Sequence, residues 1–216
     1  MAQVPGVGHV HDEVLDAGIG LGSDAVQQGG IARTAIAPQQ ASCTRCGRYH
    51  RNVITLGIDP GTAICGFGFV SFEGGTLRLV DAGCIRTTSD ESDAQRLRKL
   101  HGALLELIAA HGPSVIGVER LFFQRNVQTA MAVGQARGVA LLAAATAGVP
   151  IHEPTPNEVK QAVCGNGAAD KAQVASMVGR LLGVSLASTP DDATDALAIA
   201  IGCAYRAASV QRALAG

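Results

Sequence analysis

Four carboxylates stand where an apolar segment of the chain begins or ends. Asp59 follows the apolar run VITLGI and precedes a Pro-Gly turn, and Glu119 follows the run SVIGV. Asp192 and Asp195 are three residues apart at the start of the run ALAIAIGCA, so on a helix both side chains can face the same way. A carboxylate in such a place is costly unless it binds a proton, a cation or a cationic side chain. The four acids are therefore candidate cation ligands.

Clustered carboxylates repel one another, so they need cations between them. Hard oxygen ligands suit Mg²⁺ or Mn²⁺, which bind few protein carboxylates and otherwise keep water or substrate phosphate. Two such ions roughly 4 Å apart would bracket a scissile phosphate, one activating water and the other stabilising the leaving oxygen. The set of acids predicts metal-assisted phosphodiester hydrolysis.

Each acid also has a structural alternative when it is taken alone. Asp59 could cap the turn that follows it, and Glu119 could form a surface ion pair with Arg120 or Arg125. Asp192 could simply stabilise the start of a helix through the helix dipole. The joint occurrence of acids at two strand ends and on one helix face favours the metal site over these alternatives.

The elements that must position the acids follow from the hydrophobic pattern. Alternation and turn residues predict strands at 53–59, 65–72, 76–87, 114–119 and 149–156. Helical spacing and capping residues predict helices at 93–112, 126–147, 157–163 (capped by Asn157), 170–183 and 190–207. This order predicts a mixed five-stranded sheet flanked by helices, the α/β arrangement of the ribonuclease H-like fold. Its first and fourth strands are neighbours, so the acids could converge at one end of the sheet.

The chain of 216 residues divides into three parts. Residues 1–52 are rich in Gly, Gln, Ala and His without a sustained period, and we expect a disordered amino-terminal extension. Residues 53–208 carry the pattern of one folded domain, and residues 209–216 a short tail. Cys43, Cys46 and His50 could be half of a zinc site, but no second ligand pair follows, so we interpret them as fortuitous.

Composition narrows the class of protein. The net charge of −1 does not by itself indicate a nucleic-acid partner. The longest apolar runs fall short of the roughly 18 residues of a membrane span, and no secretory signal is evident at the amino terminus. Four cysteines stand singly in apolar segments, a pattern typical of reduced thiols in a cytoplasmic protein: Cys65, Cys84, Cys164 and Cys203.

Five motifs, in order, resemble the RuvC family of Holliday-junction endonucleases. They are GIDPGT, IGVERLFF, GQARGVALLAAA, EVKQAVCGNGAADKAQV and DDATDALAIAI, spread over roughly Val53 to Arg206. The resemblance implies a Mg²⁺-dependent homodimer that binds a four-way DNA junction and nicks two strands of like polarity symmetrically, with a preference for short cognate sequences. It also implies joint action with the RuvA–RuvB branch-migration complex in recombination and repair. Family members usually begin just before the first strand, so residues 1–52 are additional here.

The resemblance assigns roles to acidic residues by position. Asp59, Glu119, Asp192 and Asp195 fall on the family's four catalytic, metal-binding positions. Asp191 falls on none of them and is interpreted as a helix-start residue.

DNA contacts are implied at other matched positions. Phe122 matches an aromatic residue that the family uses against bases at the junction. Lys160 and Lys171, two of only three lysines, match basic positions near the cleft, where they would contact phosphates or stabilise developing charge. Arg125 and Arg137 are further candidates for phosphate contact. The Ala/Gly-rich helix from Asn126 onward matches the segment of the family's dimer interface, although small residues would also suit an ordinary core.

Three other functions compete with junction cleavage. An ASKHA-type phosphotransferase also carries a D-x-G-T hairpin, but it needs a second phosphate loop and a second lobe, for which the folded part is too short. A junction-binding module without catalysis is disfavoured because all four acids are present. A YqgF-like nuclease that processes RNA is disfavoured by the GQARG and DDATDALA segments.

Overall fold

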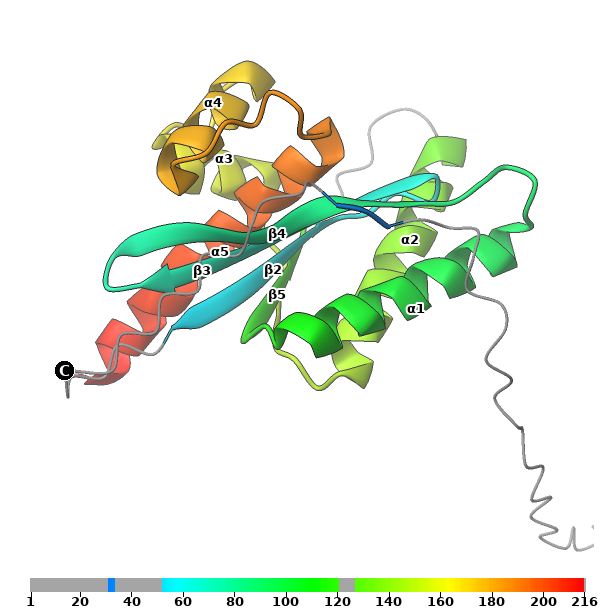
Figure 1. Cartoon of the computed structure of the whole chain (residues 1–216), viewed down its shortest axis with the longest axis horizontal. Helices are drawn as coiled ribbons and strands as arrows, with labels where there is room; N and C mark the ends of the chain where they lie inside the picture. Colours follow the sequence, from blue (N-terminus) through cyan, green and yellow to red (C-terminus); the bar gives the residue numbers. More distant parts are fainter. Residues whose placement is uncertain (1–30, 34–51, 121–126, 216) are drawn as a thin grey trace, which may run out of the picture.

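A mixed sheet forms the centre of the protein (Figure 1). The structure, a computed structural model, describes residues 31–33, 52–120 and 127–215. Strands β2 (Val53–Asp59), β3 (Ile64–Glu73) and β4 (Thr76–Arg86) form an antiparallel meander. Strand β5 (Val115–Val118) pairs in parallel with β2, and β6 (Ile151–His152) in parallel with β5. The five predicted strands thus form one mixed sheet, which confirms the predicted ribonuclease H-like arrangement.

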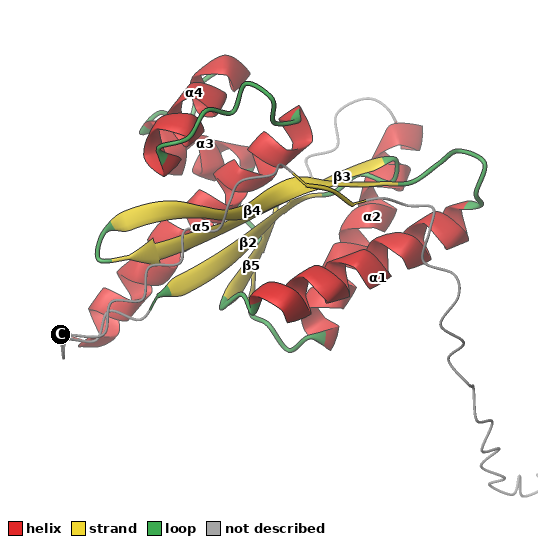
Figure 2. Ribbon diagram, viewed as in Figure 1, coloured by secondary structure: helices red, strands yellow, loops and turns green. Residues whose placement is uncertain are grey.

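Helices cover both faces of the sheet (Figure 2). Helices α1 (Asp93–His111) and α2 (Val127–Thr146) pack against each other and against the face that carries Leu56, Ile58 and Phe67. The opposite face is covered by the long helix α5 (Asp191–Ala215). Helices α3 (Pro156–Cys164) and α4 (Lys171–Leu182) pack together on α5, near its amino-terminal part (Figure 1). The start of α5 therefore lies between the sheet and the α3–α4 pair.

Helix α5 lies directly on the sheet because glycines line the strand face beneath it. A Cβ atom on Gly57 would come within 2.0 Å of the backbone oxygen of Ala196, and one on Gly66 within 2.0 Å of the backbone oxygen of Asp192. The buried hydroxyl of Thr55 donates a hydrogen bond of 2.9 Å to the carbonyl of Ala200. Strand alternation places apolar side chains toward α1 and α2 and these small residues toward α5. The first turn of α5 is thus set against the ends of β2 and β3.

Two element boundaries differ from the sequence prediction, namely the amino-terminal cap of α3 and the extent of the preceding strand β6. Thr155, and not Asn157, caps the helix: its side chain accepts from the Glu158 N–H, and the Glu158 carboxylate accepts from the Thr155 N–H. Pro156 occupies the first helical turn, where its missing N–H costs nothing, so the cap lies one residue before it. Strand β6 is much shorter than predicted because prolines at 150 and 154 flank it and cannot donate ladder hydrogen bonds.

The ends of the domain also differ from the prediction. A three-residue strand, β1 (Ile31–Arg33), pairs antiparallel with β4 inside the segment expected to be disordered. An edge strand such as β4 presents free backbone groups to which a short segment can add. The expected tail at 209–216 is helical through Ala215, because Ala-rich sequence without Gly or Pro continues α5. Residues 1–30 and 34–51 lie outside the described residues.

The cysteines of the described residues are unpaired, as predicted. Cys65, Cys84 and Cys203 are buried, and Cys164 is partly exposed. Burial raises the pKa of the Cys65 and Cys203 thiols to about 12, so neither carries a thiolate at neutral pH. Cys65, Cys84 and Cys203 are core residues.

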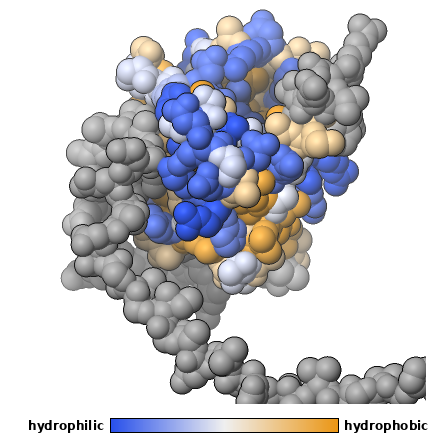
Figure 3. Space-filling model, turned by 90° about the vertical axis from the view of Figure 1, so that its right-hand side faces the viewer, coloured by the Kyte–Doolittle hydropathy of each residue, from blue (hydrophilic) through white to orange (hydrophobic). Residues whose placement is uncertain are grey.

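The surface includes isolated apolar side chains. Figure 3 shows one side of the protein on which hydrophilic residues surround smaller hydrophobic areas. Four large apolar side chains are exposed in the described part of the chain: Met131, Leu142, Ile151 and Val210. None of the described helices has both the length and the apolar character that a membrane crossing requires.

Replacing Gly57 by Ala tests whether the close packing of α5 on β2 stabilises the fold. We expect Gly57→Ala to lower the free energy of unfolding by about 1–3 kcal/mol, because the obstacle is helix backbone and cannot rotate away. Gly102→Ala in α1 is the matched control, since its Cβ meets nothing within 4 Å and a helical Gly→Ala change stabilises by about 0.5–1 kcal/mol. Urea unfolding followed by circular dichroism measures the stability of both variants. Equal stability of Gly57→Ala and the wild type would contradict the close packing of α5 on β2.

Candidate active site

Asp59 and Glu119 stand at the same edge of the sheet. Strands β2 and β5 are parallel neighbours, with Ile58 opposite Val118, so the residues that follow them emerge side by side. Asp195 reaches the same place from the first turns of α5, which lies across β2 and β3. These three carboxylates line one cavity of about 220 Å³, together with Lys160 of α3 and Lys171 of α4. Five of the residues predicted from sequence are thereby brought together.

Asp192 lies beside this cavity without lining it. Its backbone oxygen is packed against Gly66 of β3, and its charge contributes to raising the pKa of Asp59. The cavity lining therefore holds three of the four predicted acids, and the fourth acts on one of them, Asp59, through its charge.

Burial and neighbouring carboxylates raise the pKa of two acids of the site, Asp59 and Glu119. Burial, followed by the charges of Asp195, Glu119 and Asp192, raises the pKa of Asp59 from 3.8 to about 7, and Lys171 partly opposes this. Burial and then the charge of Asp195 raise the pKa of Glu119, while Lys160 lowers it. The site carries more negative charge than its two lysines neutralise, and an added cation would relieve the repulsion.

Lys171 connects two carboxylates of α5. Its ammonium nitrogen lies 3.1 Å from Asp195 Oδ2 and 3.3 Å from Asp191 Oδ2. These contacts, the hydrogen bond to Asp195 first, raise the pKa of Lys171. Asp191 therefore does more than begin a helix: with Asp195, one turn later, it holds the lysine at the mouth of the cavity. Its place directly before D-A-T-D gave no sign of this from sequence.

The turn that follows Asp59 is held in place by a hydrogen bond from Thr87, the first residue after β4. The Thr87 hydroxyl donates to the Thr62 carbonyl at 2.6 Å and accepts from Arg96 Nε at 2.9 Å. Gly61 is required within this turn, because a Cβ there would come within 2.1 Å of the Ile64 oxygen. Pro60 and Gly61 thus turn the chain away from the Asp59 carboxylate, and Thr87 holds the turn in place.

Arg137 is directed at protein groups rather than open solvent. Its Nε donates to the backbone carbonyl of Glu119 at 3.1 Å, and its Nη2 forms an ion pair with Glu153. Glu153 was not singled out from the sequence. Phe122 and Arg125, the remaining predicted DNA contacts, lie outside the described residues, as do Cys43 and Cys46.

Known proteins match both the sequence and this arrangement. The family model of the crossover junction endodeoxyribonuclease RuvC matches residues 55–203. The chain belongs to the RuvC family. The crossover junction endodeoxyribonuclease RuvC of Chloroflexus aurantiacus is 53% identical over 157 residues, which make up 73% of this chain and 96% of that protein.

Solved RuvC structures agree with this membership. RuvC of Thermus thermophilus matches with a TM-score of 0.68 and 38% identity, over 73% of this chain and 96% of its own. The same protein in complex with a Holliday junction substrate matches with a TM-score of 0.67 and 36% identity, with the same coverage. The RuvC match extends from β2 into α5, so it includes all the carboxylates described above.

The donor set of this RuvC site fits a hard divalent cation. The four carboxylates line or adjoin one cavity, and burial together with neighbouring carboxylates raises the pKa of Asp59 and that of Glu119. Within the described ranges, no group of three or more His, Cys, Asp or Glu side chains already surrounds one point that could hold a metal ion. Lys171 pairs with Asp195 in the arrangement seen here, so that carboxylate is shared between the cavity and an ammonium group.

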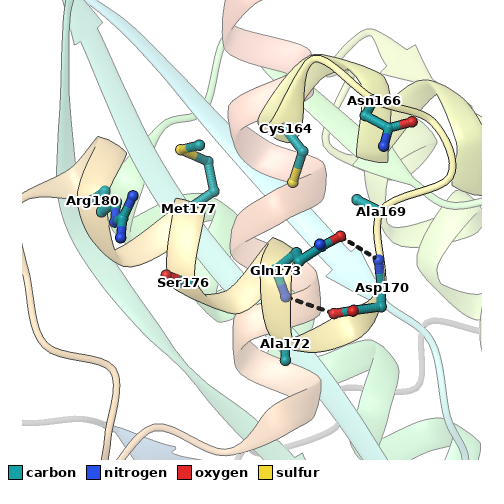
Figure 4. A pocket seen from close by; sticks show the side chains of 9 residues that line it. All are labelled: Cys164, Asn166, Ala169, Asp170, Ala172, Gln173, Ser176, Met177 and Arg180. Carbon is teal, nitrogen blue, oxygen red and sulfur yellow. Dashed lines mark hydrogen bonds between the residues drawn. The ribbon is translucent and has the colours of Figure 1, made fainter.

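A larger hollow on α4 is distinct from the acidic cavity. It has a volume of about 510 Å³ and lies between the end of α3, the following loop and α4 (Figure 4). Its one carboxylate, Asp170, caps α4 by accepting from the Gln173 N–H at 2.8 Å, as the dashed lines in Figure 4 show. It lacks the convergent acids of the cavity at Asp59.

The raised pKa of Asp59 predicts how stability changes with pH in the absence of divalent cations. Between pH 3.8 and about 7 the folded protein keeps a proton on Asp59 that the unfolded chain has lost, so this residue makes stability fall as pH rises through that window. Asp59→Asn removes this effect. We expect the variant to exceed the wild type in free energy of unfolding at a pH of about 8, with the excess shrinking toward a pH of about 4.

Urea unfolding in EDTA at several pH values measures this difference. Asp90→Asn, on an exposed turn, is the matched control and should show no such pH-dependent excess. An excess for Asp59→Asn that stays constant across the pH range would contradict the assigned cause.

Proposed function

We propose that this protein is a Mg²⁺-dependent crossover junction endodeoxyribonuclease that resolves four-way DNA junctions by hydrolysing phosphodiester bonds. The observation that carries the proposal is the convergence of Asp59, Glu119 and Asp195 on one cavity beside Lys160 and Lys171. Carboxylates next to ammonium groups suit a phosphate substrate together with hard cations. Membership of the RuvC family supplies the substrate class, since T. thermophilus RuvC has been solved with a Holliday junction.

Asp59, Glu119, Asp192 and Asp195 are the residues that would hold the metal. Bound Mg²⁺, or Mn²⁺ in its place, supplies Lewis acidity and a more acidic water, and two ions per site suit in-line displacement at phosphate. Asp59 is held at the end of β2, and Glu119 directly after β5, so the sheet keeps both carboxylates at a fixed separation. Rigid placement of this kind reduces the reorganisation needed to reach the transition state.

The two lysines act on the substrate. Lys171 is 60% exposed and stands at the mouth of the cavity, and Lys160 lines its wall. Both would contact phosphate oxygens and oppose the negative charge that develops during cleavage. Phe122 and Arg125 are proposed as further DNA contacts, with the aromatic ring stacking on a base at the opened crossover.

Symmetric nicking needs two active sites, and we assign these to a homodimer. Met131 and Leu142 are exposed on α2, the helix that the resemblance assigns to the dimer interface, and their apolar surface supports this assignment. Joint action with a RuvA–RuvB complex in recombination and repair, and residence with DNA in the cytoplasm, complete the proposal.

The competing functions are less compatible with these observations. An ASKHA-type phosphotransferase needs a second lobe, whereas the RuvC relative from C. aurantiacus is matched over 96% of its length by one domain. A YqgF-like RNA-processing nuclease would use similar acids, but the family match is to RuvC. The substrate distinguishes these functions. The junction endonuclease acts on a four-way DNA junction, the YqgF-like nuclease on structured RNA and the phosphotransferase on ATP.

Asp59→Asn is the decisive variant. We expect the wild type to nick a four-way junction symmetrically with Mg²⁺ and to leave a linear duplex of the same sequence intact. Asp59→Asn should reduce the single-turnover cleavage rate at least about 10³-fold, because it removes a metal ligand, and should leave the junction Kd within about twofold, because it removes no phosphate contact.

Denaturing gels measure cleavage, and mobility shifts in Ca²⁺ measure binding. Asp90→Asn is the matched control and should cleave at the wild-type rate. Loss of junction binding in Asp59→Asn, or ATP turnover by a wild type that does not nick DNA, would overturn the proposal.

A further inference from the structure

Both polar groups of the peptide unit that follows Glu119 are hydrogen bonded to other elements. Its carbonyl, that of Glu119, accepts from Arg137 Nε at 3.1 Å, and its N–H, that of Arg120, donates to the Pro154 carbonyl at 2.8 Å. These two groups belong to one planar unit. Fixing both therefore fixes the backbone rotation on the carboxyl side of Glu119, beyond the last ladder pair of β5. The direction of the Glu119 side chain depends on this rotation.

Glu153 closes the arrangement into a ring. It forms an ion pair with Arg137 Nη2 and directly precedes Pro154, which accepts from the same peptide unit. The planar guanidinium of Arg137 thus joins α2 to the ends of β5 and β6 through two of its nitrogens. The Arg137 side chain is only 19% exposed, so most of its surface is taken up by protein and not offered to a ligand.

We propose that Arg137 is a positioning residue for the catalytic site, which together with Glu153 fixes the peptide unit that orients the Glu119 carboxylate. This inference rests on the proposed function, because it is there that Glu119 acts. It replaces the phosphate contact that the sequence suggested for Arg137. A phosphate-binding arginine presents its donors to solvent, whereas this one directs them to a backbone carbonyl and a carboxylate.

The two roles predict opposite results for Glu153→Gln. If Arg137 orients Glu119, removing its ion-pair partner loosens the guanidinium, so cleavage slows and junction binding stays the same. If Arg137 binds phosphate, the same change frees the arginine and removes a negative charge, so junction binding tightens. Glu106→Gln, an exposed acid on α1, is the matched control for the loss of charge.

Arg137→Gln and Arg137→Lys test the arginine itself. For Arg137→Gln we expect single-turnover cleavage at saturating junction to slow by about 10- to 100-fold, as for other residues that orient metal ligands. The Mg²⁺ concentration for half-maximal cleavage should rise, which a simple loss of folded protein would not cause. Arg137→Lys should remain impaired, because one ammonium cannot reproduce the two directed contacts. Arg98→Gln on the exposed face of α1 is the charge-matched control.

Junction binding supplies the readout that is independent of catalysis. We expect the Kd in Ca²⁺, and the slope of log K against log salt, to be unchanged in Arg137→Gln and Glu153→Gln. A slope smaller by about 0.9, the contribution of one phosphate contact, would overturn the positioning role. Wild-type cleavage by both variants would also overturn it, and Glu153→Gln decides alone if Arg137→Gln does not fold.

Failure of the proposed function is recognised separately. A wild type that does not nick the junction would refute the nuclease itself and this role with it, whereas an Asp59→Asn variant that cleaves normally would refute the catalytic site assigned to that nuclease. A wild type that cleaves, an inactive Asp59→Asn and an Arg137→Gln that loses binding would refute the positioning role alone.

Discussion

The contact on which the site depends is the direct packing of α5 against β2 and β3. Gly57 and Gly66 leave no side chain between helix and sheet, and the Thr55–Ala200 hydrogen bond ties the two at the same level. Asp195 is thereby brought to the end of β2, where Asp59 stands. Carboxylates this close destabilise the ligand-free fold, as the raised pKa of Asp59 indicates. Apolar burial along the rest of α5, where Leu197 and Ile201 are fully enclosed, supplies the opposing stabilisation.

Much of this arrangement can be inferred from sequence, because it follows from periodicity and topology. Strand ends at Asp59 and Glu119 can be read from where apolar runs stop, and parallel neighbours put such ends at one edge. The helix cap could likewise have been inferred from local sequence. Thr155 and Asn157 are both good capping residues, and only the pairing of Thr155 with Glu158 three residues later separates them. Strand β1 has no periodic signal, since its pairing depends on the free edge of β4.

The partners of the charged side chains could not be inferred in this way. Arg137 and Glu153 are distant in sequence, and neither carries a local pattern that names the other. An arginine near a nuclease motif is naturally interpreted as a phosphate contact, because sequence gives its charge and not its direction. The same holds for Asp191, whose part in holding Lys171 depends on how α4 packs on α5. Residue type was predictable at these positions, whereas the partner was a property of the tertiary structure.

The charged groups of the site differ in how firmly they are held, and this difference bears on catalysis. Asp59 and Glu119 are attached to the sheet, and the peptide after Glu119 is bonded on both sides, so these carboxylates keep their positions. Lys171 is mostly exposed and is held by carboxylates near the surface, contacts that contribute about 0–1 kcal/mol each. In the proposed nuclease its ammonium would therefore exchange Asp195 for a phosphate oxygen with little change in free energy. In the proposed nuclease the carboxylates would thus stay rigid, while the ammonium group of Lys171 would be free to follow the substrate.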